Sequence, residues 1–296
     1  MPKYALMFLF LVLFTTAGGP NALGSGRIEV LFLAGEGWFG KEGYRYSLLD
    51  LALSKSGRPY TITVLDEGIP QVRRSRMIQK SSRPYIMNMG TSPEREKHLR
   101  AIYFPMFLGI GSGYRLMFTR RELGERLHTV RNIEDLRKFT IGQGRHWTDV
   151  AILENAGFNV QQVSEKKLLW KMTARGRFDL FPRGIFEIYE EYENFKNALP
   201  DLVIDEHVLI TYPFAIYFFV NKKNEDLALT IEAGLRAAYD SGEIQDLLLR
   251  KSGRGVKAAL QNLHRRVRID LPAYNITKKS LGTLRRFNFD SEKYTD

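Results

Sequence analysis

Arginines that follow predicted strands are the residues of this chain best suited to bind an anion. Arg95 ends the loop 91–95, which comes directly after a predicted strand, and Arg183 follows another one. A guanidinium group can bind a carboxylate through two parallel hydrogen bonds, a geometry that the lysine ammonium cannot copy. The alternative for Arg95 is a surface salt bridge with Glu94 or Glu96. We expect Arg95 and Arg183 to contact an anionic ligand.

A second anion-binding element is predicted where a strand is followed by a helix at residues 143–146. Gly144, Arg145 and His146 stand at the predicted helix N-terminus. Free backbone N–H groups and the helix dipole favour an anion at such a place, and the two side chains would add charge or hydrogen-bond donors. The alternative is an ordinary helix start with solvated side chains. We expect all three residues in the binding site.

Residues 35–40 read Gly-Glu-Gly-Trp-Phe-Gly, the glycine spacing of a dinucleotide-binding loop. The loop follows a predicted strand, and Asp66 ends the next strand. However, Glu36 would lie beside the pyrophosphate, and two bulky aromatic side chains would crowd the loop. Glycine-rich turns after a first strand are common in α/β proteins, so we expect no nucleotide cofactor.

Other chemistry finds little support in the residue types. The chain contains no cysteine, no serine nucleophile elbow and no phosphate-binding loop. The histidines do not have the spacing of metal ligands; they are His98, His128, His146, His207 and His264. We therefore expect no metal and no cofactor, and we assign no catalytic residue.

The charge balance indicates acidic partners. Lysine and arginine total 44 against 33 aspartate and glutamate, a formal net charge of +11. This favours carboxylate or phosphate ligands, nucleic acid, or an acidic membrane surface. The basic clusters at 73–76, 120–121 and 264–268 come without a zinc-finger spacing or an RNA-binding aromatic motif. We expect solvated surface at these clusters and no nucleic-acid partner.

The first 26 residues have the layout of a secretory signal peptide. Lys3 gives a positive start, residues 5–14 are unbroken apolar sequence, and small or turn-forming residues follow. The apolar run is shorter than the ~20 residues that a membrane-spanning helix needs. The alternative is an uncleaved anchor or a buried strand. We expect cleavage between Ala17 and Gly26, near Ala22, and a periplasmic location.

Strands and helices alternate from residue 27 onward. Apolar runs rich in β-branched residues predict strands at 28–34, 60–65, 85–89, 114–119, 160–163 and 214–220. Helical spacing of apolar residues predicts helices at 44–55, 147–154, 185–195 and 227–238. This order predicts an α/β protein with two lobes and mixed, mostly parallel sheets.

The expected domain boundaries follow the chain order. Residues 27–109 and 213–252 form the first lobe, and residues 110–212 form the second. A glycine-rich turn at 109–113 and the segment 210–214 would cross between the lobes and form a hinge. Residues 253–296 are expected to be a basic, irregular tail on the surface. A cleft between the lobes is where a ligand would bind.

Three motifs in this order resemble those of the periplasmic solute-binding proteins with the type II periplasmic binding fold. They are Thr-Ser-Pro-Glu-Arg at 91–95, Gln-Gly-Arg-His at 143–146 and Gly-Arg-Phe-Asp at 176–179. More narrowly, they are similar to family 3, which binds polar amino acids for ABC transporters. The likeness covers residues 27–252 and implies two lobes joined by two crossover strands.

The resemblance also implies roles for individual residues. It assigns the ligand carboxylate to Arg95 with Thr91, and it places an aromatic such as Trp38 or Phe39 against the ligand. These two aromatics could instead pack in the core or between the lobes. Relatives that bind α-amino acids carry an aspartate for the ammonium group where this chain has Gly184. Glu187, one turn further on, could replace it.

The resemblance predicts a monomeric binding protein that closes over a small anionic solute, an amino acid or another carboxylate. Its partner would be the membrane permease of an ABC-type transporter. One alternative is a ligand sensor that signals to a membrane protein. Another is a dehydratase-like enzyme on the same scaffold, with His146 and either Glu36 or Glu187 as candidate acid groups.

Overall fold

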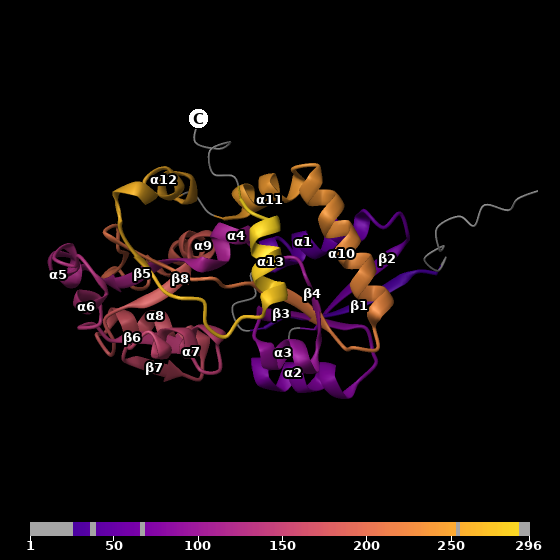
Figure 1. Cartoon of the computed structure of the whole chain (residues 1–296), viewed down its shortest axis with the longest axis horizontal. Coiled ribbons are helices and arrows are strands. Elements are labelled where there is room, and N and C mark those ends of the chain that lie inside the picture. The colour runs from indigo at the N-terminus through magenta and orange to yellow at the C-terminus, as the bar shows by residue number, and fades with distance from the viewer. Residues whose placement is uncertain (1–25, 36–39, 66–68, 253–254, 290–296) are drawn as a thin grey trace, which may run out of the picture.

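The computed structural model describes residues 26–35, 40–65, 69–252 and 255–289. These residues form two α/β lobes side by side (Figure 1). Trp38 and Phe39, most of the glycine motif at 35–40, and the predicted signal peptide up to residue 25 lie outside the described residues. No described helix is long and apolar enough to cross a membrane.

The first lobe is built on a five-stranded sheet with the order β2-β1-β3-β11-β4. Strand β1 pairs in parallel with β2 and β3, whereas β11 runs antiparallel to β3 and β4. The buried strand β11 begins at Ile216, two residues after the start of the predicted strand 214–220. The bounds are β1 Ile28–Leu33, β2 Tyr60–Leu65, β3 Tyr85–Gly90, β4 Arg100–Ile102 and β11 Ile216–Val220.

Helices cover both faces of this sheet. Figure 1 shows α10 and α11 on one side and α2 and α3 on the other. The apolar positions of α1 and α10 are buried, as helical spacing predicts. The bounds are α1 Tyr44–Ser54, α2 Gln71–Lys80, α3 Pro93–His98, α10 Glu225–Asp240 and α11 Glu243–Lys251.

The second lobe is built around β5, which pairs antiparallel with β8, β9 and β10. A separate parallel pair, β6 and β7, is linked to it by a bridge between Ile141 and Leu180. The strands are β5 Tyr114–Arg120, β6 Ile141–Gly144, β7 Val160–Val163, β8 Phe181–Gly184, β9 Leu202–Ile204 and β10 Val208–Thr211. The helices are α5 Gly124–His128, α6 Ile133–Leu136, α7 Thr148–Asn155, α8 Lys166–Ala174 and α9 Ile185–Phe195.

Two segments cross between the lobes close to the predicted hinge. The expected turn at 109–113 is instead the short helix α4, Leu108–Gly113. The second crossing runs from β10 to β11. A Cβ atom on Gly113 would lie 2.3 Å from the Tyr212 carbonyl oxygen, so only glycine lets the two crossings approach this closely.

The C-terminal segment is regular, so the expectation of an irregular tail is wrong. Helix α12 (Val256–Gln261) is followed by strand β12 (Val267–Asp270), which pairs in parallel with β10 of the second lobe. Helix α13 (Lys278–Arg286) then lies over the junction of the lobes (Figure 1) and is followed by Phe287, which packs on Phe104 of the first lobe. Alternating apolar residues at 267, 269 and 271 were the sequence signal for β12.

Candidate functional site

A cavity of 620 Å³ lies between the two lobes. The first lobe contributes the ends of β1 and β3, the starts of α1 and α2, and Arg95. The second lobe contributes the loops β6–α7, β7–α8 and β8–α9. Carboxyl ends of strands and N-termini of helices meet here, which is where open α/β sheets bind ligands.

Arg95 reaches across the cavity from the first lobe to the second. Its Nη1 donates to the Gly90 carbonyl and to Thr148 Oγ1 at 2.7 Å, and its Nη2 donates to the His146 carbonyl at 2.6 Å. All three acceptors are neutral, and no described carboxylate lies within ion-pair distance of this guanidinium. Burial lowers the pKa of Arg95 to about 10, which still leaves the group charged near neutral pH.

Gly144, Arg145 and His146 line the cavity, but they do not form the expected helix N-terminus, because Gly144 ends β6 and α7 begins at Thr148. Gly144 is buried, whereas the side chains of Arg145 and His146 are exposed. His146 has a φ of 66°, a conformation that is strained for a residue with a side chain. This conformation accompanies the hydrogen bond from Arg95 to the His146 carbonyl.

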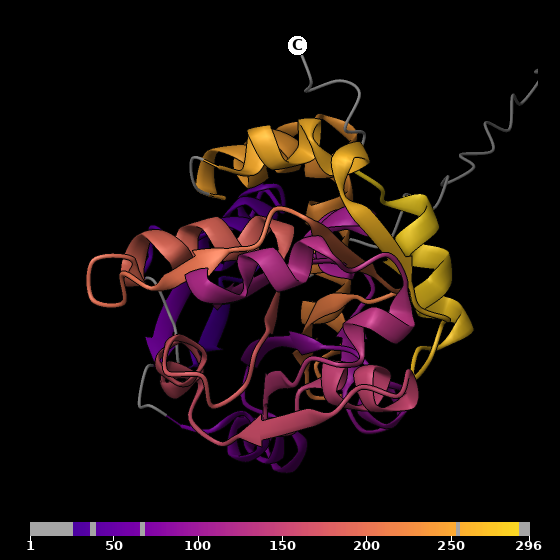
Figure 2. The same ribbon diagram turned by 90° about the vertical axis from the view of Figure 1, so that its left-hand side faces the viewer.

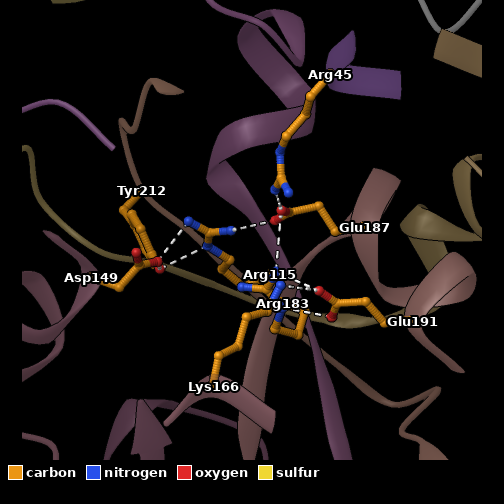
Figure 3. A network of polar contacts seen from close by, with 8 residues as sticks. All are labelled: Arg45, Arg115, Asp149, Lys166, Arg183, Glu187, Glu191 and Tyr212. Atoms are coloured by element: carbon orange, nitrogen blue, oxygen red, sulfur yellow. Dashed lines mark hydrogen bonds and ion pairs between the residues drawn. The ribbon is translucent and has the colours of Figure 1, made fainter. Parts of the chain in front are cut away.

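Arg183 belongs to a buried network of opposite charges (Figure 3). Its guanidinium donates two hydrogen bonds of 2.7 Å to Glu191 and lies 3.1 Å from Glu187. Arg45, at the start of α1, donates to Glu187 at 2.5 Å and so links the first lobe to the second. Lys166 pairs with Glu191 at 3.2 Å.

A second branch of the network is centred on Arg115, which is only 2% exposed. Its Nη2 lies 2.6 Å from Asp149 Oδ1, and its Nε donates to the Tyr212 hydroxyl at 2.8 Å. The same hydroxyl donates to Asp149 at 2.6 Å. Glu187 lies 3.9 Å from Arg115 and joins the two branches.

The network keeps the carboxylate of Glu187 ionised. Burial alone would raise the pKa of Glu187, but Arg183, Arg45 and Arg115 surround it and lower that pKa to about 2. Burial raises the pKa of the Tyr212 hydroxyl, so it remains a neutral donor to Asp149. Burial lowers the pKa of Lys166, the cation at the start of α8.

The predicted site residues divide into three groups. Arg95, Gly144, Arg145, His146 and Arg183 line the cavity together. The Thr91 hydroxyl donates to Glu96 at 2.6 Å, and Thr91 is not among the lining residues. Trp38 and Phe39 lie outside the described residues.

Sequence reasoning missed Arg45, Arg115, Asp149 and Lys166, although all four line the cavity. The available signal was Arg115 itself, an arginine inside an apolar strand. A buried arginine needs a carboxylate partner, which the sequence does not identify.

No protein-family model and no curated protein matches the chain. Several solved structures do match the chain. The BvgS VFT2 domain of Bordetella pertussis matches with a TM-score of 0.60 at 16% identity over 76% of this chain and 92% of that one. A putative binding component of an ABC transporter from Wolinella succinogenes, complexed with lysine, matches with a TM-score of 0.57 at 14% identity, over 76% of this chain and 95% of that one.

The chain has the type II periplasmic binding fold. An ancestral arginine-binding protein bound to arginine matches in the same way, with a TM-score of 0.55, 16% identity, and coverage of 78% of this chain and all of that one. The predicted two-lobe α/β fold with mixed sheets is therefore confirmed, although antiparallel pairs outnumber parallel ones among the described strands. The resemblance to the periplasmic binding proteins is confirmed as a likeness in fold. The interlobe cavity corresponds to the cleft that this two-lobe fold predicts.

Proposed function

We propose that the chain is an extracytoplasmic solute-binding protein that captures a small anionic solute between its lobes. The proposal depends on one observation, the interlobe cavity lined by basic side chains from both lobes. A solute that contacts both lobes would favour the closed arrangement. Its proposed contacts are Arg95, Gly144, Arg145, His146, Arg183, Trp38 and Phe39.

The closed form would be recognised by a membrane partner, either an ABC-type permease or a sensor. Solved structures with this fold support both, because their names include an ABC transporter binding component and a histidine kinase sensor domain. In this proposal the chain works as a monomer in the periplasm after its signal peptide is removed.

Replacing Arg95 with alanine tests the site. Hydrogen bonds to a charged group contribute about 1.5–3 kcal/mol, so we expect R95A to weaken solute binding by ~10- to 100-fold. The solute would first be found by a thermal-shift screen of amino acids, dicarboxylates and cyclic carboxylates. Isothermal titration calorimetry would then compare the variant with the unmodified chain.

Arg175→Ala is the matched control, because Arg175 is exposed at the end of α8 and does not line the cavity. Equal affinities for R95A and the unmodified chain would contradict the proposed role of Arg95. Turnover of the identified solute would favour the enzymatic alternative.

A further inference from the structure

The carboxylates that line the cavity are already paired with cations. Asp149 accepts from Arg115 and Tyr212, and Glu187 accepts from Arg45 and lies next to Arg183. Glu165 is the third carboxylate of the described lining, and it pairs with Lys167 at 3.6 Å. An ammonium group brought to Glu187 would meet three guanidinium groups, so its repulsion by them opposes its attraction to the carboxylate.

The positive side chains of the lining outnumber these carboxylates. They are Arg45, Arg74, Arg95, Arg115, Arg145, Lys166, Lys167 and Arg183. Glu191, directly behind the lining, adds one more negative charge. Among the described residues the excess is therefore positive, also when Arg74 and Lys166 are left out of the comparison. A bound solute with more than one negative charge would balance this excess better than a zwitterion.

Two separate groups of donors face the cavity from the second lobe. The first is the start of α7, where Thr148 lies beside the Arg95 guanidinium. The second is the start of α8, with Lys166 and Lys167. Arg145 lies next to this group, because its backbone N–H donates to the carbonyl of Val163 at the end of β7. Neither helix has a side chain that caps its N-terminus, so the dipoles of both add to the cations beside them.

We propose that the solute is a dianion with two acidic groups and no ammonium group. One acidic group would bind at Arg95 and Thr148, and the other at Arg145, Lys166 and Lys167. This inference rests on the proposed function and specifies the substrate class of the same site.

Matched ligand pairs test the inference. Succinate and L-aspartate have the same carboxylate spacing and differ by the ammonium group, as do glutarate and L-glutamate. Of the two dicarboxylates, we expect the one that binds more tightly to exceed the affinity of its amino-acid counterpart by at least ~10-fold, as measured by calorimetry on the full chain. Inorganic phosphate is tested as a further dianion. If an amino acid binds as tightly as its counterpart, and R95A abolishes this binding, the inference fails and the proposed function stands. Binding by none of these anions would overturn the inference, and the proposed function would also fail if the whole thermal-shift screen found no ligand.

A double variant tests the second donor group. Arg145→Ala with Lys167→Ala removes two exposed cations, so the fold should persist. We expect the ratio of dicarboxylate affinity to butyrate affinity to fall by at least ~10-fold. The control, Lys171→Ala with Arg175→Ala, removes two exposed cations of α8 that do not line the cavity. If Arg145→Ala with Lys167→Ala leaves the ratio of dicarboxylate to butyrate affinity unchanged, the second donor group does not bind the second acidic group.

Discussion

At the scale of single residues, Glu187 shows how this cavity handles charge. Its carboxylate contacts guanidinium groups from α1, β5 and β8. A buried carboxylate that loses such partners is strongly destabilising, whereas the complete network mainly fixes geometry. Glu187 therefore holds in place the three guanidinium groups of Arg45, Arg115 and Arg183 that line the cavity.

The lowered pKa of Glu187 predicts how stability depends on pH. Because the folded value is about 2 and the ordinary value is 4.5, ionisation stabilises the fold above pH 4.5. This contribution, on the order of 3 kcal/mol, is lost as pH falls from 4.5 toward 2. In Glu187→Gln the unfolding free energy should depend less on pH within this range, as measured by urea denaturation at each pH.

Glu122→Gln is the control for this experiment, because Glu122 is exposed and does not line the cavity. A pH dependence in Glu187→Gln as steep as that of the control would show that the Glu187 ion pairs do not stabilise the fold.

At the scale of elements, the carboxylate of Glu96 on α3 connects the C-terminal segment to the first lobe. It accepts hydrogen bonds from Thr91 at 2.6 Å, Thr277 at 2.8 Å and Ser280 at 2.7 Å, and a longer one from Tyr103. Thr277 and Ser280 belong to the N-terminal turn of α13. These hydrogen bonds thus connect α3, the helix that carries Arg95, to the start of α13.

Glu96→Gln should loosen α13. The amide nitrogen cannot accept a hydrogen bond, so about 1.5–3 kcal/mol of stability would be lost. Hydrogen–deuterium exchange should be faster in residues 277–286 than in the unmodified chain. Glu94→Gln, on the exposed side of the same helix, should change neither quantity. Unchanged exchange in Glu96→Gln would show that other contacts hold α13 in place.

At the scale of the whole molecule, the two segments that cross between the lobes pack closely against each other. Gly113→Ala would place a methyl group against the Tyr212 carbonyl, and we expect a loss of about 1–3 kcal/mol of stability. Gly124→Ala is the control, since a methyl group there would have no neighbour within 4 Å and the backbone is helical. Differential scanning calorimetry should show a lower Tm for the first variant alone. Equal Tm values would contradict tight packing at the crossings.

The sequence alone was sufficient to predict the helices and strands whose own residues show a clear periodic pattern. The strand at 160–163 and the helix at 185–195 have the predicted bounds, because periodicity and burial agree there. Arg95 and Arg183 both line the cavity, although Arg183 lies within β8 and not after a strand as expected. The partners of Arg115, and the pairing of β12 with β10, depend on contacts between distant segments. Such contacts leave no pattern in a single sequence.

The C-terminal segment gives the two lobes additional covalent connections. After the two crossings of the hinge, the chain returns to the second lobe between α11 and α12, and to the first lobe between β12 and α13 (Figures 1 and 2). If the chain has the proposed function, a binding protein whose lobes are connected in this way samples a narrower range of open arrangements when it is empty. Less free energy is then consumed in ordering it when solute arrives, so tight retention with slow release is the expected outcome.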